Sequence, residues 1–379
     1  MRRGTFVRWG IPIAAAAVIG AAIGAGPVIA AVSGDPVLPE RSAQQLLADA
    51  VAAVERTGGP LPMSGTVRQT ASLGLPALPQ MGGESPLALL SGSHEVKVWY
   101  GAHDRLRVAM PTQMNETNLI VNGGEAWYWD SDSNTATKIK VKAGAGLAHE
   151  PATPAPSDLT PQAAAAQLLA KADEHTAIGV ANTAEVAGRP AYQLVLRPKA
   201  EASLVQEVRL ALDGETYVPL QVQVFAKGSA EPAFQVGFTQ VTFTPPAEEN
   251  FTFTPPAGAK VEERTLGGEE ISGKAEKHAE EARAAAEGLK VVGEGWSSVA
   301  VVEVPDGALT GRPSGGESAD AEGRAVLDNV LKSATPVSGA WGSGKLIKTK
   351  LVTVLLTDDG RLLAGAVTPE EIVKVAGTR

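Results

Sequence analysis

The sequence contains no cysteine, and this absence excludes several kinds of chemistry at once. Without a thiol there can be no disulfide, no cysteine-ligated metal, no cysteine nucleophile and no lipid-modified cysteine. The chain also lacks a surplus of basic residues, because its formal net charge is -9 and its pI is about 5.2. A surface that binds nucleic acid needs a basic patch. We therefore expect no nucleic-acid partner.

Residue patterns that support catalysis or metal binding are also missing. The 5 histidines have no His-x-x-x-His spacing, and no Gly-x-Ser-x-Gly motif is present. The glycine-rich stretch 339–345 matches a phosphate-binding loop only in part, since Leu346 stands where a Mg²⁺-binding Ser or Thr is required. We interpret this stretch as a turn between strands. We expect no catalytic residue, no metal and no cofactor, and predict that the protein is not an enzyme.

The first residues have the pattern of an export signal. A basic region with Arg2, Arg3 and Arg8 precedes an apolar run over 11–32, and the small residues of 28–30 suit a signal peptidase. The run is also about long enough to span a bilayer. Residues 1–32 are thus a cleaved signal peptide or an N-terminal membrane anchor. Either predicts an exported protein of the cell envelope, secreted or tethered to the outer face of the cytoplasmic membrane.

Most of the remaining sequence divides into short predicted strands. Between 91 and 142, turn residues such as Asn122-Gly-Gly124 separate strands whose apolar residues alternate. Such alternation gives a sheet one apolar face and one wet face. A helix is predicted from Ser42, as the N-cap, to about Thr57. The helix, a Leu-rich loop at 72–90 and a second helix at 161–175 are candidate covers for the apolar face.

Further hairpins follow, and the last of these strands changes the parity of its large residues near Thr239-Gln240, which predicts a β-bulge. Residues 263–290 alternate in charge, as is typical of a solvated helical connector. Residues 291–379 predict a smaller C-terminal α+β domain.

The order of elements carries a resemblance to a known family. The order is helix, strand, apolar loop, meander, helix and hairpins, followed by the closing segment Phe251-Thr-Phe-Thr-Pro-Pro-Ala-Gly-Ala-Lys-Val261. With the strand Trp127-Tyr-Trp-Asp130, this order resembles the LolA-like lipoprotein-carrier superfamily, which includes LolA, LppX and the N-terminal domain of RseB/MucB. The resemblance covers about 42–261. The abundance of Ala and Gly indicates a GC-rich, actinobacterial type of source.

The resemblance implies an α+β fold in which a curved, antiparallel, incomplete β-barrel with a helical lid occupies residues 40–262. It also implies a hydrophobic cavity that holds the acyl chains of a lipid or lipoprotein. The alternative from the residues themselves is that the same side chains simply pack as core. The residues expected to line the cavity are Leu46, Leu47, Val51, Val54, Met63, Val67, Val96, Val98, Tyr100, Leu106, Val108, Met110, Leu119, Val121, Trp127 and Trp129.

Three functions remain open from the sequence. The first is a non-enzymatic carrier or binder of acyl chains, with an ABC transporter as a possible membrane partner. The second is an envelope-stress sensor of the RseB kind, which regulates an anti-sigma factor through its C-terminal domain. The third is a structural envelope protein whose sheet is filled by its own side chains. The lack of cysteine excludes the lipidated form of LppX-like relatives.

Overall fold

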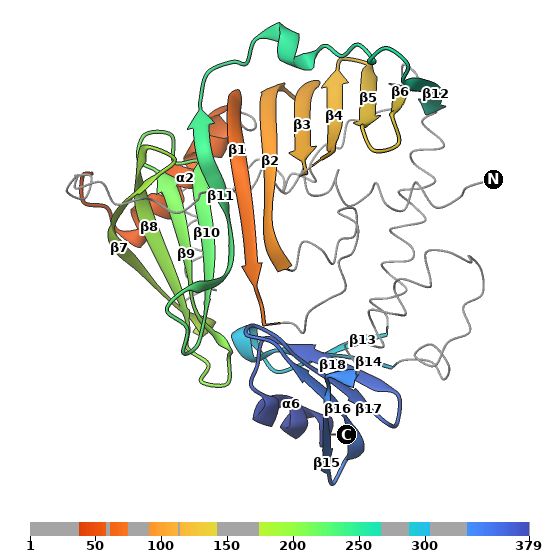
Figure 1. Ribbon diagram of the computed structural model, residues 1–379. Coiled ribbons are helices and arrows are strands. Elements are labelled where there is room, and N and C mark those ends of the chain that lie inside the picture. The colour runs from red at the N-terminus through yellow and green to blue at the C-terminus, as the bar shows by residue number, and fades with distance from the viewer. Residues whose placement is uncertain are drawn as a thin grey trace.

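The computed structural model describes residues 38–57, 61–74, 91–112, 114–141, 174–266, 288–303 and 332–378. Over these ranges the chain forms two sheets, one of 12 strands and one of 6 (Figure 1). No helix in the described ranges combines the length and the apolarity needed to cross a bilayer. Several predicted features lie outside these ranges, namely the N-terminal segment, the Leu-rich loop beyond Gly74, nearly all of the second helix and most of the charged connector.

The larger sheet has the strand order β12-β6-β5-β4-β3-β2-β1-β11-β10-β9-β8-β7. Strands that follow one another along the chain are mostly neighbours, as expected for a meander of hairpins. Its strands are β1 (Met63–Ser72), β2 (Ser91–Ala102), β3 (Arg105–Pro111), β4 (Glu116–Asn122), β5 (Glu125–Asp130), β6 (Thr135–Val141), β7 (Thr176–Val186), β8 (Arg189–Pro198), β9 (Val205–Asp213), β10 (Pro219–Ala226), β11 (Pro232–Thr242) and β12 (Lys260–Leu266).

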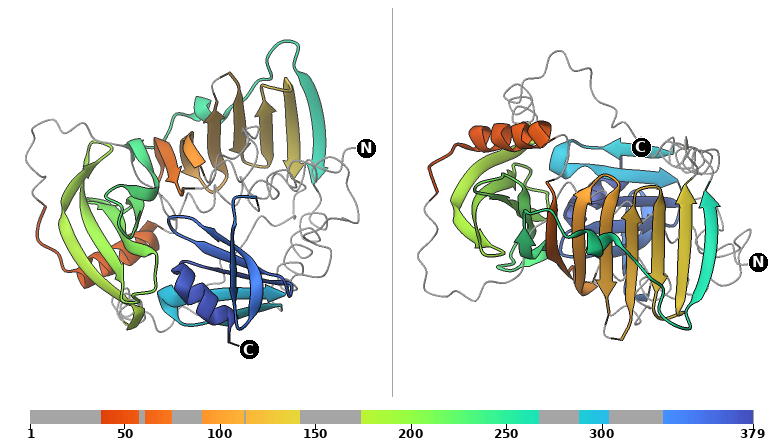
Figure 2. Two further views of the ribbon diagram at one scale, coloured as in Figure 1. Left: turned by 60° about the horizontal axis from the view of Figure 1, so that its bottom comes forward. Right: turned by 90° about the horizontal axis from the view of Figure 1, so that it is seen from above.

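This sheet is curved, open and mixed rather than purely antiparallel. Strands β7 to β10 curl away from the plane of β2 to β6, and β7 and β12 stand at the two ends of the strand order (Figure 2). The curved, incomplete barrel expected from the sequence is therefore present as an open sheet. The expectation of antiparallel pairing throughout was wrong, because β12 pairs with β6 in parallel. A long crossover precedes β12, and parallel neighbours require one.

The register of β1 against β11 contains the predicted bulge. Thr66 pairs with Gln240, whereas the next residue, Val67, pairs with Phe238. Thr239 is therefore the extra residue on β11, and its hydroxyl donates to the carbonyl oxygen of Thr66 at 3.2 Å. The parity change seen in the sequence is confirmed as a bulge, which sharpens the local twist of the sheet.

The smaller sheet is entirely antiparallel and carries a helix. Its strand order is β13-β14-β18-β17-β16-β15. Val299, Leu355, Leu363 and Ile372 are fully buried at its centre. The glycine-rich stretch is the turn of the β15–β16 hairpin, where Gly339 pairs with Gly342, so its interpretation as a turn is confirmed. The elements are β13 (Leu289–Val292), β14 (Val299–Glu303), β15 (Thr335–Gly339), β16 (Gly342–Lys348), β17 (Thr353–Thr357), β18 (Arg361–Gly365) and α6 (Pro369–Ala376).

Main-chain hydrogen bonds join the two sheets. Leu204 N–H donates to the carbonyl oxygen of Ala366 and Thr368 N–H to that of Ala202, each at 2.8 Å. At a second point, Lys350 N–H donates to the carbonyl oxygen of Leu73 at 2.7 Å. The smaller sheet is thus attached where β1 ends and where β9 begins (Figure 1).

Candidate functional site

Helix α2 (Ala43–Thr57) begins with the predicted cap. Ser42 Oγ accepts the backbone N–H of Gln45 at 3.2 Å, and Gln45 Oε1 accepts the backbone N–H of Ser42 at 2.8 Å. This reciprocal pair is a capping box, which satisfies two N–H groups that the first turn leaves without partners. The Ser42 cap is therefore confirmed.

The helix packs at the end of the sheet opposite to β6 and β12. Leu46 is fully buried against Tyr192, Leu194 and Leu212, with Leu47 among the partly buried neighbours. These partners belong to β8 and β9, so α2 covers the curled end of the sheet. The expectation that it would lie over the meander of β2 to β6 was wrong. The side chains of Val51 and Val54 lie outside the described residues.

One face of the sheet brings together most of the predicted cavity residues. Val67 pairs with Val96, Val98 with Val108, and Val108 with Leu119, and directly paired residues point to the same face. We call this the valine face. Its predicted members are Met63, Val67, Val96, Val98, Tyr100, Leu106, Val108, Met110, Leu119 and Val121.

The valine face is filled at one end and less so at the other. Met63, Val67 and Val98 are buried in a cluster with Phe238, in which Val96, Tyr100 and Leu106 also pack. Burial raises the pKa of the Tyr100 phenol, with a smaller contribution from Asp104, as expected for a partly dry environment. Toward β4 the residues Met110, Leu119 and Val121 are only partly buried.

Two predicted cavity residues lie on the other face. Trp127 pairs with Ile120 and Trp129 with Asn118, and Ile120 and Asn118 alternate with Leu119 and Val121 along β4. The placement of both tryptophans with the valines was wrong. The valine face carries Ala126 and Tyr128 on β5 instead, opposite Val121 and Leu119. The parity of β5 had been judged from its largest residues, but the Asn122–Glu125 hairpin fixes it the other way.

We call this opposite side, which carries Trp99, Trp127 and Trp129, the tryptophan face. The segment between β11 and β12, which contains the short helix η2 (Glu248–Phe251), crosses it (Figure 2). Phe251 is 2% exposed and lies against Gly101, where an added Cβ would come within 3.1 Å of the ring. Phe253 contacts Trp127 and Trp129, with ring centroids 5.5 Å and 6.1 Å away. This face is therefore filled by the chain itself.

Charged groups also gather on the tryptophan face. The Arg107 guanidinium lies 5.2 Å from the ring centroid of Trp99 and donates to Asn118 Oδ1 at 3.0 and 3.1 Å. Lys138 lies 5.4 Å from the ring centroid of Trp127 and pairs with Glu125 at 3.0 Å. Cations over indole rings add stabilisation where the ring is already partly dry. These contacts are what we expect of a packed surface on the outside of the protein.

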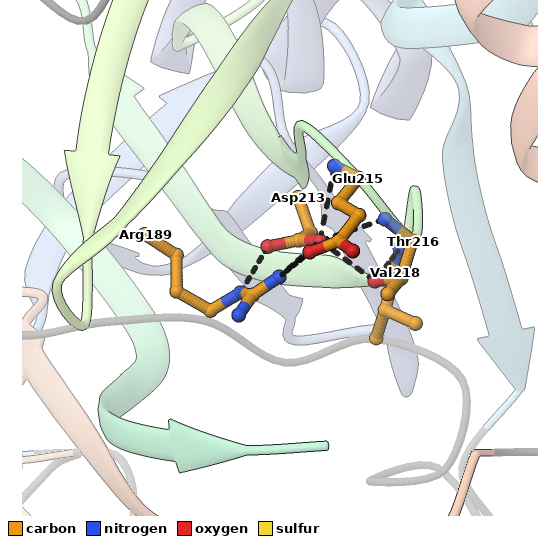
Figure 3. Close-up of polar contacts among 5 residues, drawn as sticks. All are labelled: Arg189, Asp213, Glu215, Thr216 and Val218. Atoms are coloured by element: carbon orange, nitrogen blue, oxygen red, sulfur yellow. Dashed lines mark hydrogen bonds and ion pairs between the residues drawn. The ribbon is translucent and has the colours of Figure 1, made fainter.

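A buried ion pair fixes the curled end of the sheet (Figure 3). The Asp213 carboxylate accepts two hydrogen bonds from Arg189 and, through Oδ1, those of Thr216 N–H at 2.7 Å and Thr216 Oγ at 2.8 Å. Burial alone would raise the pKa of Asp213, but the bonds from Arg189 and Thr216 outweigh it and lower the pKa. Arg189 also stacks on Phe243, 5.0 Å from the ring centroid, so the cluster ties the β7–β8 turn to β9 and to the end of β11.

The described residues contain no group of three or more His, Asp or Glu side chains placed to hold a metal. The acidic turn after β5 uses its oxygens internally. Asp130 accepts the backbone N–H of Asp132 at 2.9 Å and the hydroxyl of Ser133 at 2.8 Å. Asn134 has a φ of 47°, which Asn tolerates in tight turns.

Sequence reasoning missed the residues that fill the tryptophan face. Ile120 and Asn118 are fully buried, although their alternation with Leu119 and Val121 predicts that they lie on the wet side of β4. A usable signal was present in Phe251 and Phe253, two large apolar residues of the closing segment that need a surface to pack against.

Fold and site together define a class: a curved, open, mostly antiparallel sheet that has one apolar face covered in part, and that carries a second, smaller sheet. No protein-family model and no curated protein matches the chain. Solved structures similar to it include MucB and LolA-superfamily proteins.

A chain of the Pseudomonas aeruginosa MucA/MucB complex is 16% identical, with a TM-score of 0.39, over 88% of this chain and 96% of that one. A LolA superfamily protein from Nitrosomonas europaea is 10% identical, with a TM-score of 0.21, over 56% of this chain and 99% of that one. A lipoprotein-sorting domain from Vibrio parahaemolyticus is 11% identical, with a TM-score of 0.20, over 54% of this chain and 95% of that one. At TM-scores below 0.5 these likenesses say nothing of the function of this chain.

Proposed function

We propose that the protein is an exported, non-enzymatic binder or carrier of lipid or lipoprotein acyl chains, which it holds against the valine face. The observation that carries the proposal is the lack of charge on this face. From β2 to β4 its residues between Val96 and Val121 include no Lys, Arg, Asp or Glu, whereas Lys97, Arg107 and Glu116 point to the other side. A charge-free apolar surface that its own chain covers only in part is suited to a flexible hydrocarbon.

The expected strength of binding follows from area. Each methylene removed from water contributes about 0.8 kcal/mol, so one long acyl chain is enough for reversible micromolar binding. Met110 lies on the less buried part of this face, and its flexible thioether adapts to chains of different shape.

The test is uptake of a fluorescent fatty acid by the full chain, together with mass spectrometry of an organic extract of the purified protein. We expect saturable uptake that Leu119→Asp weakens at least about tenfold, because a carboxylate on the valine face must be desolvated under the ligand. The matched control is Lys97→Asp, which places the same carboxylate at an exposed position of the opposite face. The proposal would be overturned if no lipid co-purified and no fatty acid were taken up. If both variants lost uptake equally, the valine face would not be the binding surface.

A second candidate function is sensing through a protein partner. The observation that favours it is the smaller sheet, which main-chain hydrogen bonds tie to the larger one. In these bonds Leu204 donates, whereas the carbonyl oxygens of Ala202 and Leu73 accept. We propose that this chain takes a membrane-protein partner through the smaller sheet, either an anti-sigma factor or an ABC transporter. Pull-down of membrane proteins by the full chain and by a chain lacking 291–379 separates the two functions, because a carrier keeps fatty-acid uptake and a sensor loses its partner.

A further inference from the structure

A pocket of about 440 Å³ lies between the two sheets, away from the valine face. Its walls come from three places: Gly74 after β1, the β10–β11 turn with Lys227 and Gly228, and the β16–β17 turn with Lys348 and Lys350. It therefore lies beside the second of the two main-chain junctions, where Lys350 N–H donates to Leu73.

The pocket is strongly basic for a protein with a net charge of -9. Lys227 Nζ donates to the main-chain oxygen of Glu201 at 2.7 Å, and Lys350 Nζ donates to Ser72 Oγ at 3.0 Å. Both acceptors are uncharged, and each ammonium group has three N–H donors, of which this uses one. Lys227, Lys348 and Lys350 thus line one pocket from both sheets, and all three are exposed to solvent.

Carboxylates near the pocket do not neutralise it. In the part of the chain that the structure describes, no ion pair within 4.0 Å joins a carboxylate to Lys227, Lys348 or Lys350. Lys348 interacts electrostatically with Glu370 of helix α6. The pKa of Glu370 is lowered first by a backbone N–H, then by Thr368, and least by Lys348.

The lysines stand on fixed turns. Thr349 Oγ accepts hydrogen bonds from the backbone N–H groups of Leu351 at 3.2 Å and of Val352 at 2.9 Å. These bonds fix the conformation of the β16–β17 turn. On the other wall, Lys227 N–H donates to the main-chain oxygen of Leu204 at 2.8 Å. Fixed positions lower the entropy cost of collecting several cations around one ligand.

We propose that this pocket binds a phosphate-bearing anion, held by Lys227 from the larger sheet and by Lys348 and Lys350 from the smaller one. The anion neutralises the three ammonium groups and so stabilises the junction of the two sheets. The volume exceeds that of one phosphate and accommodates a diphosphate or a phosphorylated headgroup. If the ligand is a free anion, the proposal is independent of lipid binding by the valine face. If the ligand is a lipid headgroup, the proposal rests on that proposed function.

The experiment titrates the full chain with inorganic phosphate and with pyrophosphate at constant ionic strength, by calorimetry and by thermal unfolding. We expect saturable binding, an increase in Tm, and a loss of affinity of about tenfold in Lys227→Gln/Lys350→Gln, since charge-assisted hydrogen bonds are removed. Lys227→Arg/Lys350→Arg keeps the charges and is expected to retain binding. The matched control is Lys374→Gln, because Lys374 is an exposed lysine of α6 that is bonded to Glu371.

A second arm uses vesicles of phosphatidylglycerol against vesicles of phosphatidylcholine. If free phosphate binds, a soluble anion is a sufficient ligand. If only the phosphatidylglycerol vesicles bind, and the double Gln variant loses this binding, the ligand is a lipid headgroup. The proposal is overturned if neither probe binds saturably, or if the double Gln variant binds as well as Lys374→Gln. Fatty-acid uptake is measured in parallel. Leu119→Asp is expected to reduce uptake, whereas the double Gln variant is expected to leave it unchanged. The anion-site proposal and the acyl-chain proposal can therefore fail independently.

Discussion

The valine face and the tryptophan face belong to the same strands, yet they are covered in different ways. On the tryptophan face, Ile120 is 1% exposed and Phe251 is 2% exposed, because the segment before β12 crosses it. On the valine face, Leu119 and Val121 flank Ile120 in sequence and are only partly buried. The comparison teaches that apolar residues on a strand do not by themselves mark the core. The side on which the chain crosses back decides which face is filled.

The largest expected effect distinguishes the two faces by stability. Phe251→Ala is predicted to lower the free energy of unfolding by about 3–5 kcal/mol, because it leaves a cavity under the crossing segment. Leu119→Ala is predicted to cost clearly less, since its side chain is only partly buried. Urea unfolding of both variants measures the difference. An equal or larger cost for Leu119→Ala would mean that the valine face of β4 is core.

The second prediction concerns the curled end, where the valine face is closed. Asp213→Asn is expected to destabilise by about 3 kcal/mol near neutral pH, because Arg189 loses its buried partner. The folded pKa of Asp213 is lowered, so its stabilisation is present above the unfolded pKa and is lost as pH falls through the folded pKa.

The pH dependence provides the check on that prediction. Wild-type stability is expected to fall below about pH 4, and the difference between wild type and Asp213→Asn is expected to shrink over the same range. Unfolding curves at several pH values measure it. A difference that stays constant as the pH falls would contradict the role given to the carboxylate.

Gly65→Ala sharpens the contrast between the filled and the less covered parts of the valine face. A Cβ at Gly65 would come within 2.7 Å of both the Phe238 ring and the Gln240 carbonyl oxygen. Overpacking of this kind costs about 1–3 kcal/mol. Thermal unfolding is the measurement, with Gly179→Ala on β7 as the control, where an added Cβ meets nothing within 4 Å. An unchanged Tm for Gly65→Ala would show that this end is not tightly packed.

The smallest expected effect is at the start of α2. Ser42→Ala removes one half of the capping box and is expected to cost about 1 kcal/mol. Because α2 covers β8 and β9, fatty-acid uptake at the less buried part of the valine face is expected to remain. Denaturant unfolding and uptake are measured on the same preparation, and a strong loss of uptake would show that the helix contributes to the lipid site.

Much of the fold was predictable because local chemistry determines it. Ser42 with Gln45 and the Asn122–Glu125 hairpin each depend on residues close in the chain. The Thr239 bulge involves a distant strand, but it is visible as a change of parity within β11 itself. The side occupied by the crossing segment depends on contacts between Phe253 and Trp127, which are far apart in sequence. Trp127 and Trp129 were misplaced for a different reason, since the Asn122–Glu125 hairpin, and not the size of the side chains, sets the parity of β5. The position of α2 beside Tyr192 and Leu194, rather than over the meander, again depends on contacts far apart in sequence.

The central claim is that the valine face, and not the tryptophan face, holds an acyl chain. The most direct measurement is an isotope-filtered NOE experiment on methyl-labelled protein with bound palmitate. The account predicts contacts from the acyl chain to the methyl groups of Leu119 and Val121 and none to Ile120, which lies between them on the opposite face. Contacts to Ile120, or saturable palmitate binding without contacts to Leu119 and Val121, would contradict it.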